Sequence, residues 1–283
     1  MIVDTHTHMV INKTDIGEQV RRDLASCGMS PGMWDFTEED YINGTSAAGK
    51  AVVFGIKAQK TGWNADNENI AAFVSRQNKN KNKYIFFASI DPLDIDFIEQ
   101  LRHCHNNLGC KGVKLGPVYQ GVHPLDAKYY EIYNYCQKHN LTIITHMAAT
   151  FSSGVPIEYA RPALMDHVAC DFPDLKIIMA HLGHPWENEA IVCVRKQPNL
   201  YADISALYYR PWQFYNSMRL LEEYNAAKKV FFGSDFPACT TQDSIDGIMN
   251  LNKIISNSGL PLVSQNIIDE ILYKNPIEIL GLE

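Results

Sequence analysis

The sequence has 283 residues, of which 46% are hydrophobic and 20% are charged, as is typical of a folded globular protein. The net charge of -7 and the lack of a Lys/Arg stripe argue against a nucleic-acid partner, and no run of ~18 apolar residues predicts a membrane span. The seven cysteines show no paired spacing, and the chain starts with an apolar strand instead of an export signal. We therefore expect reduced thiols and a cytoplasmic location.

Eight short apolar segments alternate with helical patterns along the chain. The predicted strands cover residues 2–8, 51–56, 84–90, 112–115, 141–146, 175–181, 200–205 and 229–235. The first connection, residues 9–50, is long and contains two helical patterns, at about 15–26 and 37–48, so we expect a helical insertion near the mouth of the active site.

This alternation predicts a parallel sheet that is covered on both faces. Eight strands and a length close to ~250 residues are typical of an α/β protein with a (β/α)8 TIM barrel, and we expect residues 1–283 to form one such domain. A doubly wound open sheet is the alternative. It is less favoured because no glycine-rich dinucleotide motif follows the first strand.

Five polar residues stand at the carboxyl ends of the predicted strands. His6 and His8 are two apart on the first strand, so their rings leave the same face. His146 ends the fifth strand, His181 the sixth and Asp235 the eighth. A single histidine is weak evidence of a ligand, but in a barrel these ends meet at one mouth. Imidazole and carboxylate groups are ligands of zinc and similar ions, so the sequence predicts a divalent metal site.

The chain resembles the amidohydrolase superfamily, and within it the amidohydrolase-related group that includes the aminocarboxymuconate-semialdehyde decarboxylase-like enzymes. The resemblance spans essentially the whole chain. Besides the paired histidines it rests on residues 112–117 (GVKLGP), 160–162 (ARP), 172–176 (FPDLK), 180–186 (AHLGHPW), 232–237 (FGSDFP), 275–276 (NP) and 280–282 (LGL).

This resemblance implies a metal-dependent hydrolase-type barrel in which His6, His8, His146 and Asp235 bind one divalent ion, with His181 beside it. Zinc is the first expectation, with manganese or iron as alternatives. Family members with two metals use a carbamylated lysine on the fourth strand as a bridge, and Lys114 occupies that strand. A lysine that pairs with a carboxylate is the commoner fate of a buried ammonium. The resemblance also implies a homodimer or homotetramer.

Such a site supports hydrolysis of an amide, ester or lactone of a small carboxylated molecule, with Asp235 as base and then acid and His181 as a second catalytic residue near the oxyanion. Non-oxidative decarboxylation of an aromatic or unsaturated acid uses the same residues and is the alternative. A barrel that binds a ligand without turnover is a third reading. Predicted substrate contacts come from loops after the strands: Trp63, Tyr119, Arg161, His184 and Arg210. For each arginine, a pair with a nearby carboxylate is the alternative.

Overall fold

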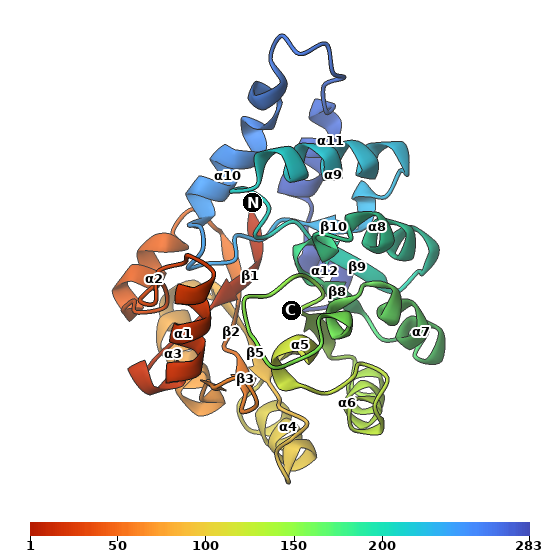
Figure 1. Cartoon of the computed structure of the whole chain (residues 1–283). Helices are drawn as coiled ribbons and strands as arrows, with labels where there is room; N and C mark the ends of the chain where they lie inside the picture. Colours follow the sequence, from red (N-terminus) through yellow and green to blue (C-terminus); the bar gives the residue numbers. More distant parts are fainter.

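Eight parallel strands form the centre of the molecule, and helices surround them (Figure 1). The computed structural model describes the backbone of residues 1–283 and every side chain except those of residues 80 and 81. The strands pair in the order β1-β2-β5-β6-β7-β8-β9-β10. Their bounds are Val3–His8 (β1), Lys50–Phe54 (β2), Tyr84–Ser89 (β5), Gly112–Leu115 (β6), Thr142–Thr145 (β7), Ile177–Met179 (β8), Leu200–Asp203 (β9) and Val230–Phe231 (β10). The predicted (β/α)8 barrel is confirmed.

Backbone hydrogen bonds join the first strand to the segment that follows the last. The Thr5 amide donates to the Phe232 carbonyl over 3.0 Å, and the Asp235 amide donates to the His6 carbonyl over 2.9 Å. The His8 amide donates to Phe236 in the same way. These bonds close the sheet into a barrel and set the end of β1 beside Asp235.

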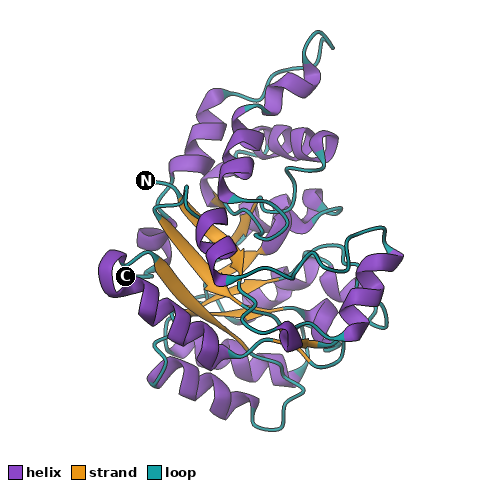
Figure 2. Ribbon diagram, turned by 90° about the vertical axis from the view of Figure 1, so that its left-hand side faces the viewer, coloured by secondary structure: helices purple, strands orange, loops and turns teal.

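The helices cover the outside of the barrel, and both termini lie on one side of the molecule (Figure 2). Among the described residues, every helix is too short or too polar to span a membrane. A two-stranded hairpin, β3 (Lys57–Ala58) and β4 (Trp63–Asn64), adds to the rim. The α-helices are Glu18–Ser26 (α1), Glu38–Gly44 (α2), Asn67–Lys81 (α3), Phe97–Asn106 (α4), Pro117–Gln120 (α5), Ala127–Lys138 (α6), Ala163–Asp171 (α7), Glu187–Lys196 (α8), Pro211–Glu223 (α9), Thr241–Met249 (α10), Gln265–Tyr273 (α11) and Pro276–Leu280 (α12).

The last helix closes one end of the barrel. Ile277, Leu280 and Leu282 join Val3 and Phe87 in a buried apolar cluster with inward-facing strand residues. Because apolar side chains fill this end, the carboxyl ends of the strands form the open end.

The two strands that were expected to end at His181 and Asp235 are much shorter in the structure than in the sequence analysis. The strand expected over residues 175–181 ends at Met179, and the one expected over 229–235 ends at Phe231. Beyond those ends the backbone turns left-handed, with φ of 60° at His181 and 63° at Asp235. The sheet therefore stops before the two side chains, and tight turns aim them at the barrel mouth.

The connection from β1 to β2 contains α1 and α2, close to the two predicted helical patterns. Asp23 of α1 accepts hydrogen bonds from the Ser153 amide at 3.1 Å and its hydroxyl at 2.9 Å. Ser153 lies in the loop after β7, so these bonds tie the inserted segment to the far side of the barrel mouth.

Candidate functional site

The paired histidines of β1 converge on one carboxylate at the barrel mouth. The Nε2 atoms of His6 and His8 lie 3.1 Å apart. Asp235 Oδ1 is 3.4 Å from the first of these nitrogens and 3.2 Å from the second. The two-residue period of the strand puts both rings on one face, and barrel closure brings the carboxylate to them.

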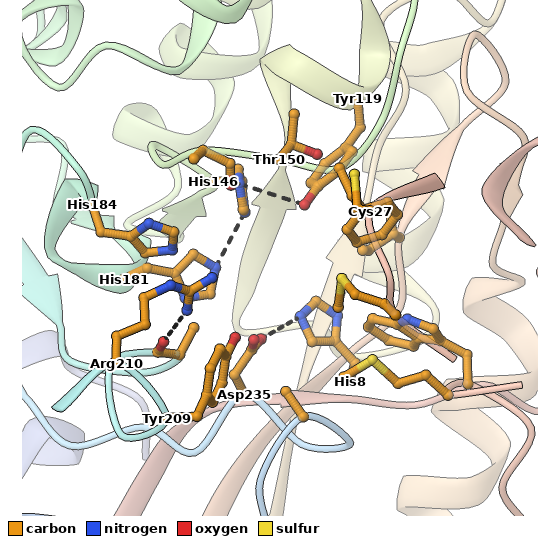
Figure 3. A pocket seen from close by; sticks show the side chains of 18 of the residues that line it. His8, Cys27, Tyr119, His146, Thr150, His181, His184, Tyr209, Arg210 and Asp235 are labelled. Carbon is orange, nitrogen blue, oxygen red and sulfur yellow. Dashed lines mark hydrogen bonds and ion pairs between the residues drawn. The ribbon is translucent and has the colours of Figure 1, made fainter. Parts of the chain in front are cut away.

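A turn after β8 supplies the third histidine. His181 Nε2 lies 3.1 Å from Nδ1 of His146, which follows β7 (Figure 3). The turn continues through Gly183, whose φ is 71°. A Cβ atom at that glycine would lie 2.5 Å from Pro162 Cγ and 2.9 Å from Ala190 Cβ. Glycine is therefore required both by the left-handed backbone and by the close packing behind the site.

Three of these residues could hold one cation. Single ligand atoms of His6, His181 and Asp235 all lie within 4.8 Å of one another. Burial, and then the nearby Lys114 ammonium, lowers the pKa of His6 to about 4. Burial also lowers the pKa of His181, so both rings are neutral at pH 7 and each has a nitrogen lone pair. Two or more imidazoles and a carboxylate fit zinc, manganese or iron.

His8 and His146, the other two expected ligands, flank this group of three. The structure thus brings together all five polar residues from the sequence analysis. His181, which was expected beside the ion, offers one of the three ligand atoms in this group.

Lys114 of β6 also reaches the site. Its Nζ atom is 3.2 Å from His6 Nε2 and 4.6 Å from the centre of the Phe54 ring. Among the described side chains, no carboxylate oxygen lies within 4.0 Å of it. Burial lowers the pKa of this amine to about 8. The expected pairing with a carboxylate is absent, and the bridging role stays a prediction.

A cavity of about 600 Å³ opens above these residues. One part of its wall is apolar and comes mainly from the inserted segment and the loop after β7. Arg210 and His184 contribute to the wall elsewhere, on the opposite side of the site from His8 and Cys27 in Figure 3. The apolar wall consists of Cys27, Met29, Met33, Trp34, Ile56 and Phe151.

Arg210 is the lining residue with a permanent positive charge. Its Nη1 atom donates to the Ala206 carbonyl over 2.5 Å, and the guanidinium lies 4.5 Å from the centre of the Tyr209 ring. No acidic side chain described by the structure forms an ion pair with it. Burial, together with this guanidinium, lowers the pKa of His184 to about 4. Arg210 therefore keeps donors for an anionic group in the cavity.

Tyr119 lies on the cavity wall at the start of the segment after β6. Its hydroxyl is 3.4 Å from His146 Nε2. Burial raises the pKa of this phenol, so it remains a hydrogen-bond donor at neutral pH.

The structure places the other two predicted substrate contacts away from the cavity. The Arg161 guanidinium forms an ion pair with Glu189 of α8 and stacks on Trp186. Trp63 is buried behind Trp34, with ring centres 4.9 Å apart, and does not line the cavity. Arg161 therefore pairs with a carboxylate on a neighbouring helix. Trp63 packs beneath the cavity wall.

Sequence reasoning missed two residues at the end of β9. The carboxylate of Asp203 is fully buried and lies 2.9 Å from His6 Nδ1, and Ser205 Oγ lies 2.8 Å from His181 Nδ1. Burial alone would raise the pKa of Asp203, but His6 and the hydrogen bonds outweigh it, so the pKa lies below its usual value. The sequence could have indicated these residues, because Asp203 and Ser205 are two positions apart at the end of a predicted strand, as His6 and His8 are.

Comparison with known proteins adds the family. No curated protein sequence matches this chain. Among solved structures, an uncharacterized TIM-barrel protein from Bordetella bronchiseptica is 21% identical, with a TM-score of 0.75 and coverage of 99% of this chain and 98% of that one. A probable 2-pyrone-4,6-dicarboxylic acid hydrolase from Acinetobacter baumannii is 14% identical, with a TM-score of 0.63 and 99% coverage of both chains.

A dihydroxybenzoic acid decarboxylase from Polaromonas, with bound manganese, is also 14% identical, with a TM-score of 0.63 and coverage of 99% and 97%. These similarities concern the fold. The sequence model of the amidohydrolase family matches residues 3–282, almost the entire chain. This chain belongs to the amidohydrolase family.

Proposed function

We propose that this chain is a metal-dependent hydrolase that attacks an amide, ester or lactone carbonyl of a small carboxylated molecule. Family membership makes it an enzyme, and the proposal concerns its reaction. The observation that carries it is the position of Asp235. Its carboxylate contacts the His6 and His8 nitrogens and lines a cavity of about 600 Å³.

The proposed ligands of the cation are His6, His8, His146 and Asp235, together with His181. A divalent cation held there supplies Lewis acidity, which makes a water molecule more acidic and a carbonyl carbon more electrophilic. Asp235 would accept the proton of the attacking water and pass it to the leaving group. Because Asp235 faces both the histidines and the cavity, one carboxylate can serve both steps.

Tyr119 and Arg210 would hold the substrate. The Tyr119 hydroxyl is a donor within the cavity and suits the oxygen on which negative charge develops. We assign it this role in place of His181, because the Nδ1 atom of that ring already contacts Ser205. The fork of Arg210 suits a substrate carboxylate, to which it can donate parallel hydrogen bonds.

Decarboxylation is the second candidate, and the apolar wall favours it. Met33, Trp34 and Phe151 offer a surface for a flat aromatic ring, and the manganese-containing decarboxylase shares the fold. A panel of lactones, esters, amides and hydroxybenzoates separates the two reactions. Proton release from the first three groups would support hydrolysis. Carbon dioxide release from hydroxybenzoates alone would replace it with decarboxylation.

Removal of the cation should abolish turnover of whichever compound is active. We expect about one zinc, manganese or iron ion per chain by elemental analysis, because the donor atoms form one compact group. Dialysis against a chelator should remove activity, and added zinc or manganese should restore it. A ratio near two would indicate that Lys114 is carbamylated and bridges two ions. Full activity without any ion would contradict the proposal.

Arg210→Gln should raise KM for a carboxylated substrate by about 10–100-fold. This factor corresponds to the free energy of one hydrogen bond to a charged group. The KM for a neutral analogue of the same shape should change little. Arg161→Gln is the matched control, because Arg161 pairs with Glu189 outside the cavity. Steady-state kinetics with both substrates tests this. Equal changes in the two variants would exclude Arg210 as the carboxylate contact.

A further inference from the structure

Asp203 collects hydrogen bonds from both sides of the site. Its Oδ2 atom lies 2.9 Å from His6 Nδ1. Its Oδ1 atom accepts from the backbone amides of His181 and Ser205, each at 3.0 Å, and from the Ser205 hydroxyl. An ionised carboxylate can only accept. The proton of the neutral His6 ring is therefore on Nδ1, and the Nε2 atom keeps its lone pair.

Ser205 determines the position of the proton on His181 in a similar way. Its hydroxyl has a single hydrogen, which it donates to Asp203. The Ser205 oxygen must then accept from His181 Nδ1, 2.8 Å away. The His181 proton is thus also on Nδ1, which leaves the lone pair on Nε2, the atom that lies 3.1 Å from His146 Nδ1 (Figure 3).

We propose that Asp203 and Ser205 are positioning residues that hold His6 and His181 in the Nδ1–H tautomer, so that both Nε2 lone pairs point to one cation. The buried carboxylate acts on His6 directly and on His181 through the serine. This inference rests on the cation site of the proposed function, but it holds for either reaction.

The two residues should be separable by substitution, because they act on different rings. In Asp203→Asn, the side-chain oxygen should face the three donors on the Oδ1 side, which leaves the amide NH2 towards His6 Nδ1. That nitrogen must then accept, and the His6 proton moves to Nε2. In Ser205→Ala, His181 Nδ1 loses its acceptor, while the contact between His6 and Asp203 remains.

The experiment is long-range ¹H–¹⁵N NMR of the full-length protein with ¹⁵N-labelled histidine, combined with zinc affinity by chelator competition. In the wild type, His6 and His181 should both be Nδ1–H tautomers. Asp203→Asn should convert His6 alone, and Ser205→Ala should release His181 alone. Each variant should bind zinc about 10–100-fold more weakly.

Asp91→Asn and Ser217→Ala are matched controls. Both residues are fully buried and hydrogen-bonded to backbone, and neither lines the cavity. They should leave both tautomers and zinc affinity unchanged. A His6 ring that stays Nδ1–H in Asp203→Asn, or equal effects of Ser205→Ala on both rings, would overturn the proposal.

Two further outcomes of the experiment also bear on the proposal. If Asp203→Asn does not fold, Ser205→Ala still tests the selective release of His181. If wild-type protein binds no zinc, manganese or iron, the proposed function fails, whereas the tautomers still report on the hydrogen bonds. If the two variants lost no more zinc affinity than the controls, the tautomers of His6 and His181 would not contribute to cation binding.

Discussion

Asp235→Asn should lower kcat by about 1000-fold, within the range expected when a general acid–base group is lost. Asparagine has nearly the same shape, and it tolerates the left-handed backbone at this position, where φ is 63°. The change therefore removes the charge and the proton acceptor while it preserves the turn. Steady-state kinetics and elemental analysis of the purified variant measure both consequences.

The control for this substitution is Asp91→Asn. Asp91 is a buried carboxylate that follows β5, outside the cavity. Its replacement should cost stability through hydrogen bonds to Leu93 and Gln59 but leave kcat close to the wild-type value. If Asp235→Asn retained more than about a tenth of the activity, another group would have to move the proton.

Gly183→Ala should strongly destabilise the protein. A left-handed alanine costs about 1–2 kcal/mol, and overpacking adds about 1–3 kcal/mol, because its Cβ atom would meet Pro162 and Ala190. We expect the free energy of unfolding to fall by about 2–5 kcal/mol and Tm by roughly 3–8 °C. Denaturant and thermal unfolding followed by circular dichroism provide the measurement.

Gly109→Ala separates the two causes. Gly109 has a φ of 70°, yet a Cβ atom there would have no neighbour within 4 Å. The free energy of unfolding of this variant should fall only by the cost of a left-handed alanine backbone, about 1–2 kcal/mol. Equal losses in the two variants would show that the contacts with Pro162 and Ala190 do not contribute.

Much of the fold and of the site follows from local patterns. The apolar runs locate the strands, and the spacing of His6 and His8 is enough to put both rings on one face. Barrel geometry then predicts that His146, His181 and Asp235 approach them, and the structure brings all five together. These features depend on periodicity and on the direction of the strands, which sequence conveys directly.

Other features depend on contacts between distant segments. The left-handed turn that starts at His181 continues through Gly183, where Pro162 and Ala190 leave no space for a side chain. Arg161 precedes α7 and meets Glu189 of α8 because these two helices pack side by side. Asp203 and Ser205 have the same two-residue spacing as His6 and His8, but an acidic residue at the end of a strand is common and does not by itself indicate a role. Its role becomes visible only once His6 is placed beside it.

The seam between β1 and the segment after β10 has a consequence for biosynthesis. Thr5 and Phe232, which bond across it, are 227 positions apart. At about 5–20 residues per second, the ribosome supplies the second partner some tens of seconds after the first. His6 and His8 therefore emerge long before the carboxylate that completes their site. If the proposed cation binds there, its loading would be a late event that marks a finished barrel, because a nascent chain that ends before Asp235 offers the histidines without the carboxylate.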